Sequence, residues 1–356
     1  MVSMEATVAG IKGTASCLAL GIAIATIRSR QLKPPSELFS ALAACCGLFR
    51  TLEPTSKRTA ACLSSIALFR LLNDKHKHIV LSYALVELAL QVYERCPQSK
   101  VLEHATSIAI ASRFIYAYLL RWEWVLPSQL KIVDKQACLS PEILAAARAE
   151  LRYGNGSRCH AFHPNKSCAK FLRDECFNHV QSGAKIFLPI HAIAAFFAWK
   201  NQRLDMSKQV VDYVKSIFCL LGSFVFPLVG SCMIPLQNHE QAIFLASLTP
   251  NIAQLIEPPK RRLTIRKAIA SYSLITVFYQ LKEYKCFSTI TRHQVITLAT
   301  IIYATCMVYL LEHPERQNRW LMYALYGHDI RQAKNKKISN QEYIVGNKEI
   351  IPSQSN

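Results

Sequence analysis

The segment CHAFHPNKSCAKFLRDECFNHV, residues 159–180, holds the side chains of this chain that are best suited to chemistry. It contains three cysteines and three histidines within a short polar stretch. Thiolate and imidazole groups are the ligands that zinc prefers, usually four of them in tetrahedral geometry. The spacing contains no pair of cysteines with two residues between them and matches no common zinc finger, so we expect no bound metal. The weak candidate ligands are Cys159, His163, Cys168, Cys176 and His179.

A cysteine–histidine nucleophile pair is a second chemistry that these residue types allow. Such a pair needs an orienting carboxylate and an oxyanion hole, and the only carboxylates nearby are Asp174 and Glu175. The sequence also has no glycine-rich phosphate loop, nucleophile elbow or HExxH zinc motif. We therefore expect no catalytic residue and no cofactor, and an enzyme with a site in this segment is the least favoured alternative.

A purely structural role of the segment is the interpretation that we favour. His163-Pro164 predicts a turn, because proline disfavours helix for the residue before it. The following helix is expected to enter its apolar phase after Lys185, whose ammonium group can reach a membrane interface. Pro189 would then lie near the start of that helix, where a missing N–H costs least.

The elements that must position this segment are apolar and basic. Of the 356 residues, 51% are hydrophobic and only 18% are charged, yet 42 Lys and Arg face 23 Asp and Glu, a net charge of +19. This combination is typical of membrane proteins with cationic loops. Because the cations lie between apolar blocks, we expect no nucleic-acid partner. Several of the thirteen cysteines, Cys219 and Cys232 among them, lie inside apolar runs and read as small hydrophobic residues.

Ten apolar segments predict helices, because they are rich in Ala and Leu and exceed the usual length of a strand. Small residues are frequent in them, as in ALAACCGLF, which lets membrane helices approach closely. We expect an all-α, polytopic membrane protein; the alternative is a soluble helical protein with many buried helices. The segments are 13–27, 37–50, 59–72, 79–95, 104–120, 184–199, 214–236, 241–256, 267–281 and 294–311.

The predicted organisation is two related helical halves with a linker and a tail. A weak repeat supports it, because SYAL at residues 82–85 is similar to SYSL at residues 271–274. In the linker, Ser140 as N-cap and Pro141 at the first helical position predict a short water-facing helix that ends near Gly154. The predicted ranges are 1–135 for the first half, 136–182 for the linker, 183–326 for the second half and 327–356 for a polar basic tail.

A basic segment, EPPKRRLTIRK at residues 257–267, joins two of the apolar segments. We expect a cytoplasmic loop with a preference for anionic lipid headgroups that serves only to set the topology; the less favoured alternative is a loop that docks a protein partner. Its cations are Lys260, Arg261, Arg262, Arg266 and Lys267.

The stretch HAFHPNKSC, followed by SGAKIFLPIHAIAAFF, resembles the signature of the transmembrane protein 135 family, which is similar to Tim17-like membrane proteins. The resemblance is best over residues 159–325 and thinner over 36–135. It implies a peroxisomal or mitochondrial membrane, protein partners in that membrane, and a role in organelle organisation, fission balance and lipid metabolism. The matching positions are His160, His163, Pro164, Cys168, Ser182, Lys185 and Pro189.

Two classes of membrane function follow as hypotheses. The first is a non-enzymatic regulator in an organelle membrane, bound to the lipid bilayer. The second is a transporter or channel, in which helices rich in small residues line a path for a lipid or a metabolite.

Overall fold

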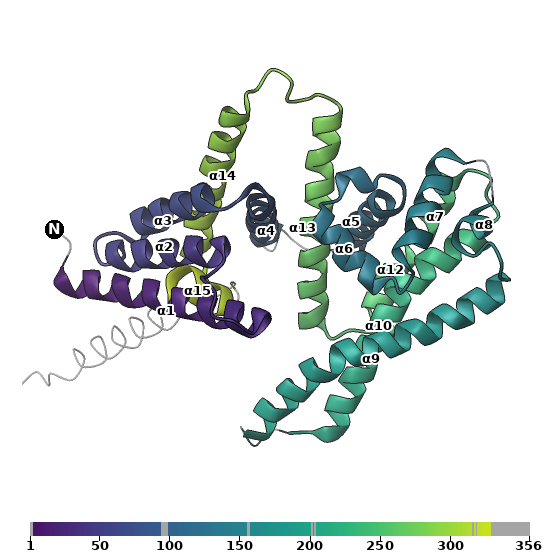
Figure 1. Cartoon of the computed structure of the whole chain (residues 1–356), viewed down its shortest axis with the longest axis horizontal. Coiled ribbons are helices and arrows are strands. Elements are labelled where there is room, and N and C mark those ends of the chain that lie inside the picture. Colours follow the sequence, from purple (N-terminus) through teal and green to yellow (C-terminus); the bar gives the residue numbers. More distant parts are fainter. Residues whose placement is uncertain are drawn as a thin grey trace, which may run out of the picture. The chain divides into compact units, whose positions relative to one another are not determined.

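The computed structural model describes residues 3–93, 99–154, 157–200, 202, 204–314, 317 and 319–328. All regular elements in these ranges are helices, which confirms the predicted all-α class (Figure 1). The ten predicted apolar segments all fall on helices, although 241–256 is divided between two short ones. The predicted tail lies outside the described residues, apart from Gly327 and His328.

The helices form two compact units, and the chain passes from the first to the second and back. The boundaries fall near residues 95 and 290, so the compact units differ from the predicted halves 1–135 and 183–326. Unit 1 contains α1 (Met4–Ser29), α2 (Glu37–Leu52), α3 (Lys57–Leu71), α4 (Asp74–Tyr93), α14 (Arg292–Glu312) and α15 (Arg319–Tyr326). Unit 2 contains α5 (Lys100–Leu120), the 3-10 helix η1 (Trp122–Trp124), α6 (Pro127–Gln136), α7 (Pro141–Tyr153), α8 (Arg158–Phe162), α9 (Cys168–Lys200), α10 (Met206–Met233), α11 (His239–Ala246), α12 (Thr249–Gln254) and α13 (Pro259–Glu283).

Unit 1 is held together by a core of aromatic and aliphatic side chains from α2, α3, α14 and α15. Phe49 packs on Tyr326 with ring centroids 4.5 Å apart, and Phe69 stacks on Tyr303 at 5.2 Å. Helix α1 packs closely along α2, because a Cβ at Gly10 would lie 2.9 Å from the carbonyl oxygen of Gly47. This close approach is the use of small residues that the sequence predicted for this region.

Unit 2 has its own core, built from α5, η1, α6, α7, α8, α9, α10 and α11. Phe162 and Phe171 are part of this core, so the predicted linker 136–182 is not a separate segment between two bodies. Its helix α7 is the one that the sequence predicted: the Ser140 hydroxyl accepts from the Ile143 N–H, and Gly154 is the C-cap. Local capping fixed this helix, whereas its apolar face, with Leu144 and Leu151, placed it in the core.

Four helices within the described ranges, α1, α9, α10 and α14, are long and apolar enough to cross a membrane. On α9 the second half presents large apolar side chains outward, with Leu188, Ile193 and Phe197 all more than half exposed. Water disfavours such a surface, so these side chains point to apolar surroundings. That they cross a bilayer, and how many times, stays a prediction.

Candidate functional site

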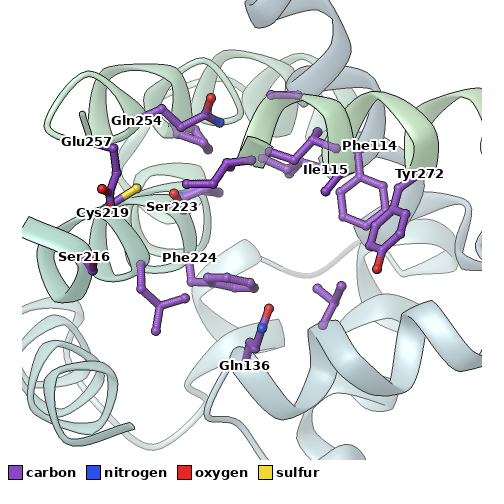
Figure 2. A pocket seen from close by; sticks show the side chains of 18 of the residues that line it. Phe114, Ile115, Gln136, Ser216, Cys219, Ser223, Phe224, Gln254, Glu257 and Tyr272 are labelled. Carbon is purple, nitrogen blue, oxygen red and sulfur yellow. The ribbon is translucent and has the colours of Figure 1, made fainter. Parts of the chain in front are cut away.

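A cavity of about 530 Å³ lies inside unit 2. It is formed where α5, α6, α9, α10, α12 and α13 meet, so six helices supply its wall. This volume falls in the range of about 300–1,000 Å³ that is typical of ligand pockets. Figure 2 shows the labelled side chains around the space, with Phe114, Ile115 and Tyr272 opposite a group that includes Ser216, Gln254 and Glu257.

Most of the wall is apolar and aromatic. Phe114 and Tyr272 pack against each other with ring centroids 5.6 Å apart, and Tyr118 lies one helical turn after Phe114 on α5. Burial raises the pKa of both tyrosines, so their hydroxyls stay protonated at neutral pH. Phe224 and Leu228 of α10 extend the same wall. A ligand of this part must therefore be apolar, because it gains free energy by leaving water and finds few polar partners.

One end of the cavity is polar and is organised by Arg261. Its guanidinium donates to the Ser216 hydroxyl at 2.7 Å and to His191 Nε2 at 3.1 Å. Because arginine has no acceptor, Nε2 of His191 must be the accepting nitrogen of a neutral ring. Arg261 Nε also lies 3.1 Å from the buried Glu257 carboxylate.

Two buried acceptors at this end lack a full set of hydrogen-bond partners. Gln254 is 1% exposed, and its Oε1 has no hydrogen-bond partner in the part of the chain that the structure describes. Glu257 is 4% exposed, and its Oε2 has an ionic contact with Arg261 but no well-directed hydrogen bond there. Buried polar atoms are normally satisfied, so these two oxygens stand out as acceptors on residues that line the cavity.

The cavity reaches the surface beside Ile132 of α6 and Ile190 of α9. Both residues line the cavity and are also half exposed, at 50% and 56%. Ile190 belongs to the outward apolar surface of α9.

The structure brings together three of the five weak metal candidates. Sγ of Cys159 lies 3.5 Å from Sγ of Cys168, which is itself 3.6 Å from Nε2 of His163. Cys176 and His179 are not part of this group. His179 is fully buried, stacks on Phe224 and directs its Nδ1 to the carbonyl of Glu175.

The remaining residues of the signature do not converge on a site. His160 on α8 and Pro164 just after this helix are exposed, while Ser182, Lys185 and Pro189 lie along α9. The prediction that Pro189 is near a helix start is wrong, because α9 begins at Cys168 and Pro189 is inside it. The helix starts early because its first half packs Phe171 and the Gly183 backbone into unit 2.

The predicted loop at 257–267 is also wrong for most of its length, because Pro259 begins α13. Positively charged side chains in the first turn of a helix are unfavourable, because this end of the helix dipole is also positive. In α13, acidic side chains and backbone carbonyls of unit 2 offset these charges. Arg261 faces Glu257 and Asp212, and Arg266 pairs with Glu103. Arg262 donates to the carbonyls of Leu255 and Glu257, so these three cations are engaged within the unit. The side chain of Lys260 lies outside the described part, and Lys267 also has an interaction partner.

Sequence reasoning missed His191, Gln254 and Glu257, which lie on three different segments of unit 2. A polar residue inside an apolar run, such as His191 in IFLPIHAIAAFF, was the signal available for one of them.

Comparison of the chain with models of known families, with curated proteins and with solved structures finds no match, so the resemblance to the transmembrane protein 135 family stays a prediction.

Proposed function

We propose that this chain is a non-enzymatic, multi-pass membrane protein whose unit 2 binds a lipid. The observation that carries the proposal is the cavity of about 530 Å³, apolar over most of its wall and bearing buried acceptors at one end. The four long apolar helices support a membrane setting by their length and composition. Lipid binding is common to the two hypotheses drawn from the sequence, a regulator of lipid metabolism and a lipid transporter.

The chemistry of the wall narrows the ligand. An acyl chain would lie between Phe114, Tyr272 and Phe224, and its polar group would reach Gln254. Because Gln254 Oε1 and Glu257 are acceptors, the polar group should donate, as a hydroxyl or an amine does. An anionic headgroup is less well suited, because Glu257 and Asp212 already neutralise Arg261 at this end.

We propose binding without reaction because the titratable side chains at the polar end of the cavity, His191, Arg261 and Glu257, interact with one another. His191 accepts from Arg261 through Nε2, so this nitrogen is not free to remove a proton from a ligand. The peroxisomal or mitochondrial membrane is the location that the resemblance suggests, and we propose it on that ground alone. Imaging of a tagged chain, with protease protection of each terminus, tests it.

Cross-linking tests the binding proposal. The full chain, purified in mild detergent, is irradiated with a photoreactive monoacylglycerol and, separately, a photoreactive long-chain amine, and the labelled peptides are identified by mass spectrometry. We expect label on α5, α10 or α13 and competition by the unlabelled lipid. Ser223→Phe places a ring inside the cavity and should abolish labelling. Ser207→Phe, the same change at an exposed position of α10, should not.

The acceptor role is tested by Gln254→Leu. Loss of one hydrogen bond should weaken binding of the hydroxyl lipid by about 0.5–1.5 kcal/mol, roughly 2- to 12-fold. Binding of a long-chain alkane, which has no donor, should not weaken. Equal labelling of wild type and Ser223→Phe would contradict binding in the cavity.

A further inference from the structure

The thiols of Cys159 and Cys168 and the imidazole of His163 are arranged at the separations that a metal ion imposes. Zinc bonds sulfur at about 2.3 Å and nitrogen at about 2.0–2.1 Å, so tetrahedral ligands should stand about 3.8 Å apart for two sulfurs and about 3.5 Å for sulfur and nitrogen. The structure has 3.5 Å between the two sulfurs and 3.6 Å between Cys168 Sγ and His163 Nε2. All three ligand atoms lie within 4.8 Å of one another. The sulfurs are too far apart for a disulfide, whose bond is about 2.05 Å.

His163 is held in the orientation of a metal ligand. Its Nδ1 lies 2.8 Å from the Lys166 carbonyl, which can only accept, so Nδ1 carries the hydrogen, and in the neutral tautomer with this hydrogen the lone pair is on Nε2. Nε2 is the nitrogen that faces Cys168. The ring is 5% exposed and stacks on Phe171 with centroids 4.7 Å apart. Such a backbone carbonyl behind a histidine is the usual outer partner of a metal-binding imidazole.

The end of α10 offers a candidate for a fourth ligand, Cys232, although its sulfur is not one of the three ligand atoms that lie within 4.8 Å of one another. Arg158 of α8 fixes the end of α10 beside the three ligands, because its guanidinium donates to the carbonyls of Ser231 and Ile234 at 2.6 Å each. Cys159 follows Arg158 on α8 and Cys232 follows Ser231 on α10, so this contact brings together the two segments that carry these cysteines.

The position of these cysteines in the fold would allow a bound ion to link two helices. Helices α9 and α10 pack antiparallel, with the Tyr213 hydroxyl donating to the Ala184 carbonyl (Figure 1). Cys168 is the first residue of α9, and Cys232 is the last but one of α10. The two helix ends that carry these cysteines therefore meet, away from the connection between Lys200 and Met206.

We propose that one Zn²⁺ binds these four side chains as a closed structural site; the four-residue cluster is Cys159, His163, Cys168 and Cys232. Three thiolates and one imidazole in tetrahedral arrangement favour zinc over harder cations, which prefer oxygen ligands. The ion would fasten α8 and the start of α9 to the end of α10. This zinc site departs from the expectation of no bound metal, because that expectation considered only ligands from residues 159–180. The proposal goes beyond lipid binding and does not rest on it.

Elemental analysis of the purified chain tests the site. The full chain is produced with added zinc, purified in mild detergent under reducing conditions and freed of loose metal by dialysis. We expect one zinc per chain in wild type and in Cys176→Ser, a control on the same helix whose thiol is outside the cluster. Cys168→Ser should lose the zinc. Wild type without zinc, or Cys168→Ser with as much zinc as wild type, would overturn the proposal.

Cobalt substitution gives a second readout on the wild-type chain itself, so the test survives a variant that fails to fold. After removal of zinc with a chelator, Co²⁺ alone should produce thiolate-to-cobalt charge-transfer bands and the intense visible bands of a tetrahedral site. Absence of these bands in a chain whose circular dichroism shows that it is still folded would refute the site.

Cys232→Ser tests the fourth ligand. It should weaken Co²⁺ binding by more than the 10- to 100-fold that loss of an outer partner typically costs, about 100-fold or more, and reduce the charge-transfer intensity. Unchanged affinity and intensity in this variant would exclude Cys232. A disulfide between Cys159 and Cys168, found by mass spectrometry of the unreduced chain, would show that the pair is redox-active and overturn the zinc site.

Discussion

Arg148 of α7 ties three helices of unit 2 together, and its removal should destabilise the unit measurably. The side chain is 6% exposed and forms an ion pair with Asp134 of α6. Its Nε donates to the Tyr118 carbonyl at 3.1 Å, near the end of α5, where helix carbonyls lack an internal partner. The guanidinium also lies over the Tyr118 ring, 4.5 Å from the centroid. Arg148→Met keeps much of the apolar stem and removes all of these interactions.

The magnitude follows from what the substitution leaves unpaired. Breaking a buried ion pair typically costs about 3–5 kcal/mol. Asp134 is 21% exposed and keeps the Tyr118 hydroxyl at 2.9 Å, so water and this donor reduce the penalty. We therefore expect a loss of about 2–3 kcal/mol in the free energy of unfolding, with the unpaired Tyr118 carbonyl included. For a unit of this size that corresponds to a decrease of about 4–12 °C in Tm.

Thermal unfolding in detergent, followed by tryptophan fluorescence, measures this shift because Trp124 is buried in the same core. Arg58→Met is the matched control: its pair with Glu312 is exposed, with Arg58 at 77%, and should contribute less than about 1 kcal/mol. Arg148→Met combined with Asp134→Leu should recover part of the loss, since no carboxylate is then left without its partner. A decrease in Tm no larger than that of Arg58→Met would refute this reasoning.

Three further predictions concern packing, pH and the membrane. Gly10→Val should destabilise unit 1 by about 1–3 kcal/mol, because its branched side chain meets the Gly47 carbonyl and the Thr51 hydroxyl. Ala23→Val, on an exposed face of α1, should not destabilise the unit. The Tm values of the two variants are compared, and equal values would count against the close contact between α1 and α2. The hydrogen bond from Arg292 lowers the pKa of Asp74, so this pair stabilises unit 1 above the unfolded carboxyl pKa of about 3.9 and is lost as pH falls through the folded value. Since Arg292 is 81% exposed, the effect should stay below about 1 kcal/mol at low salt and vanish in Arg292→Gln; a Tm difference between pH 7 and pH 3 that is the same in both chains would contradict it. Alkaline carbonate extraction of membranes should leave the chain in the pellet, and its release into the supernatant would contradict membrane spanning.

Local interactions made the helices predictable from the sequence. A helix closes its hydrogen bonds within four residues, so the Ala- and Leu-rich runs and the Ser140–Pro141 cap were sufficient to place α7 and most other helices. The start of α9 was not predictable in this way. Its polar first half has no apolar run to mark it, and it is helical because Phe171 and His179 find partners in the core of unit 2.

The candidate sites depend on residues that the chain separates and the fold unites. Gln254 and Phe114 share one cavity although 140 positions apart, because α5, α12 and α13 converge in unit 2. Cys232 reads as a small hydrophobic residue in an apolar run, and its proposed part in the zinc site depends on the packing of α9 on α10 and on the contact of Arg158 with the end of α10. The sequence by itself determined the helical class, the apolar and basic character and the ligand types of the cysteine–histidine segment. Which ligands meet, and which cations of 257–267 are neutralised, depended on long-range packing, because side-chain distances across helices are not encoded in local spacing.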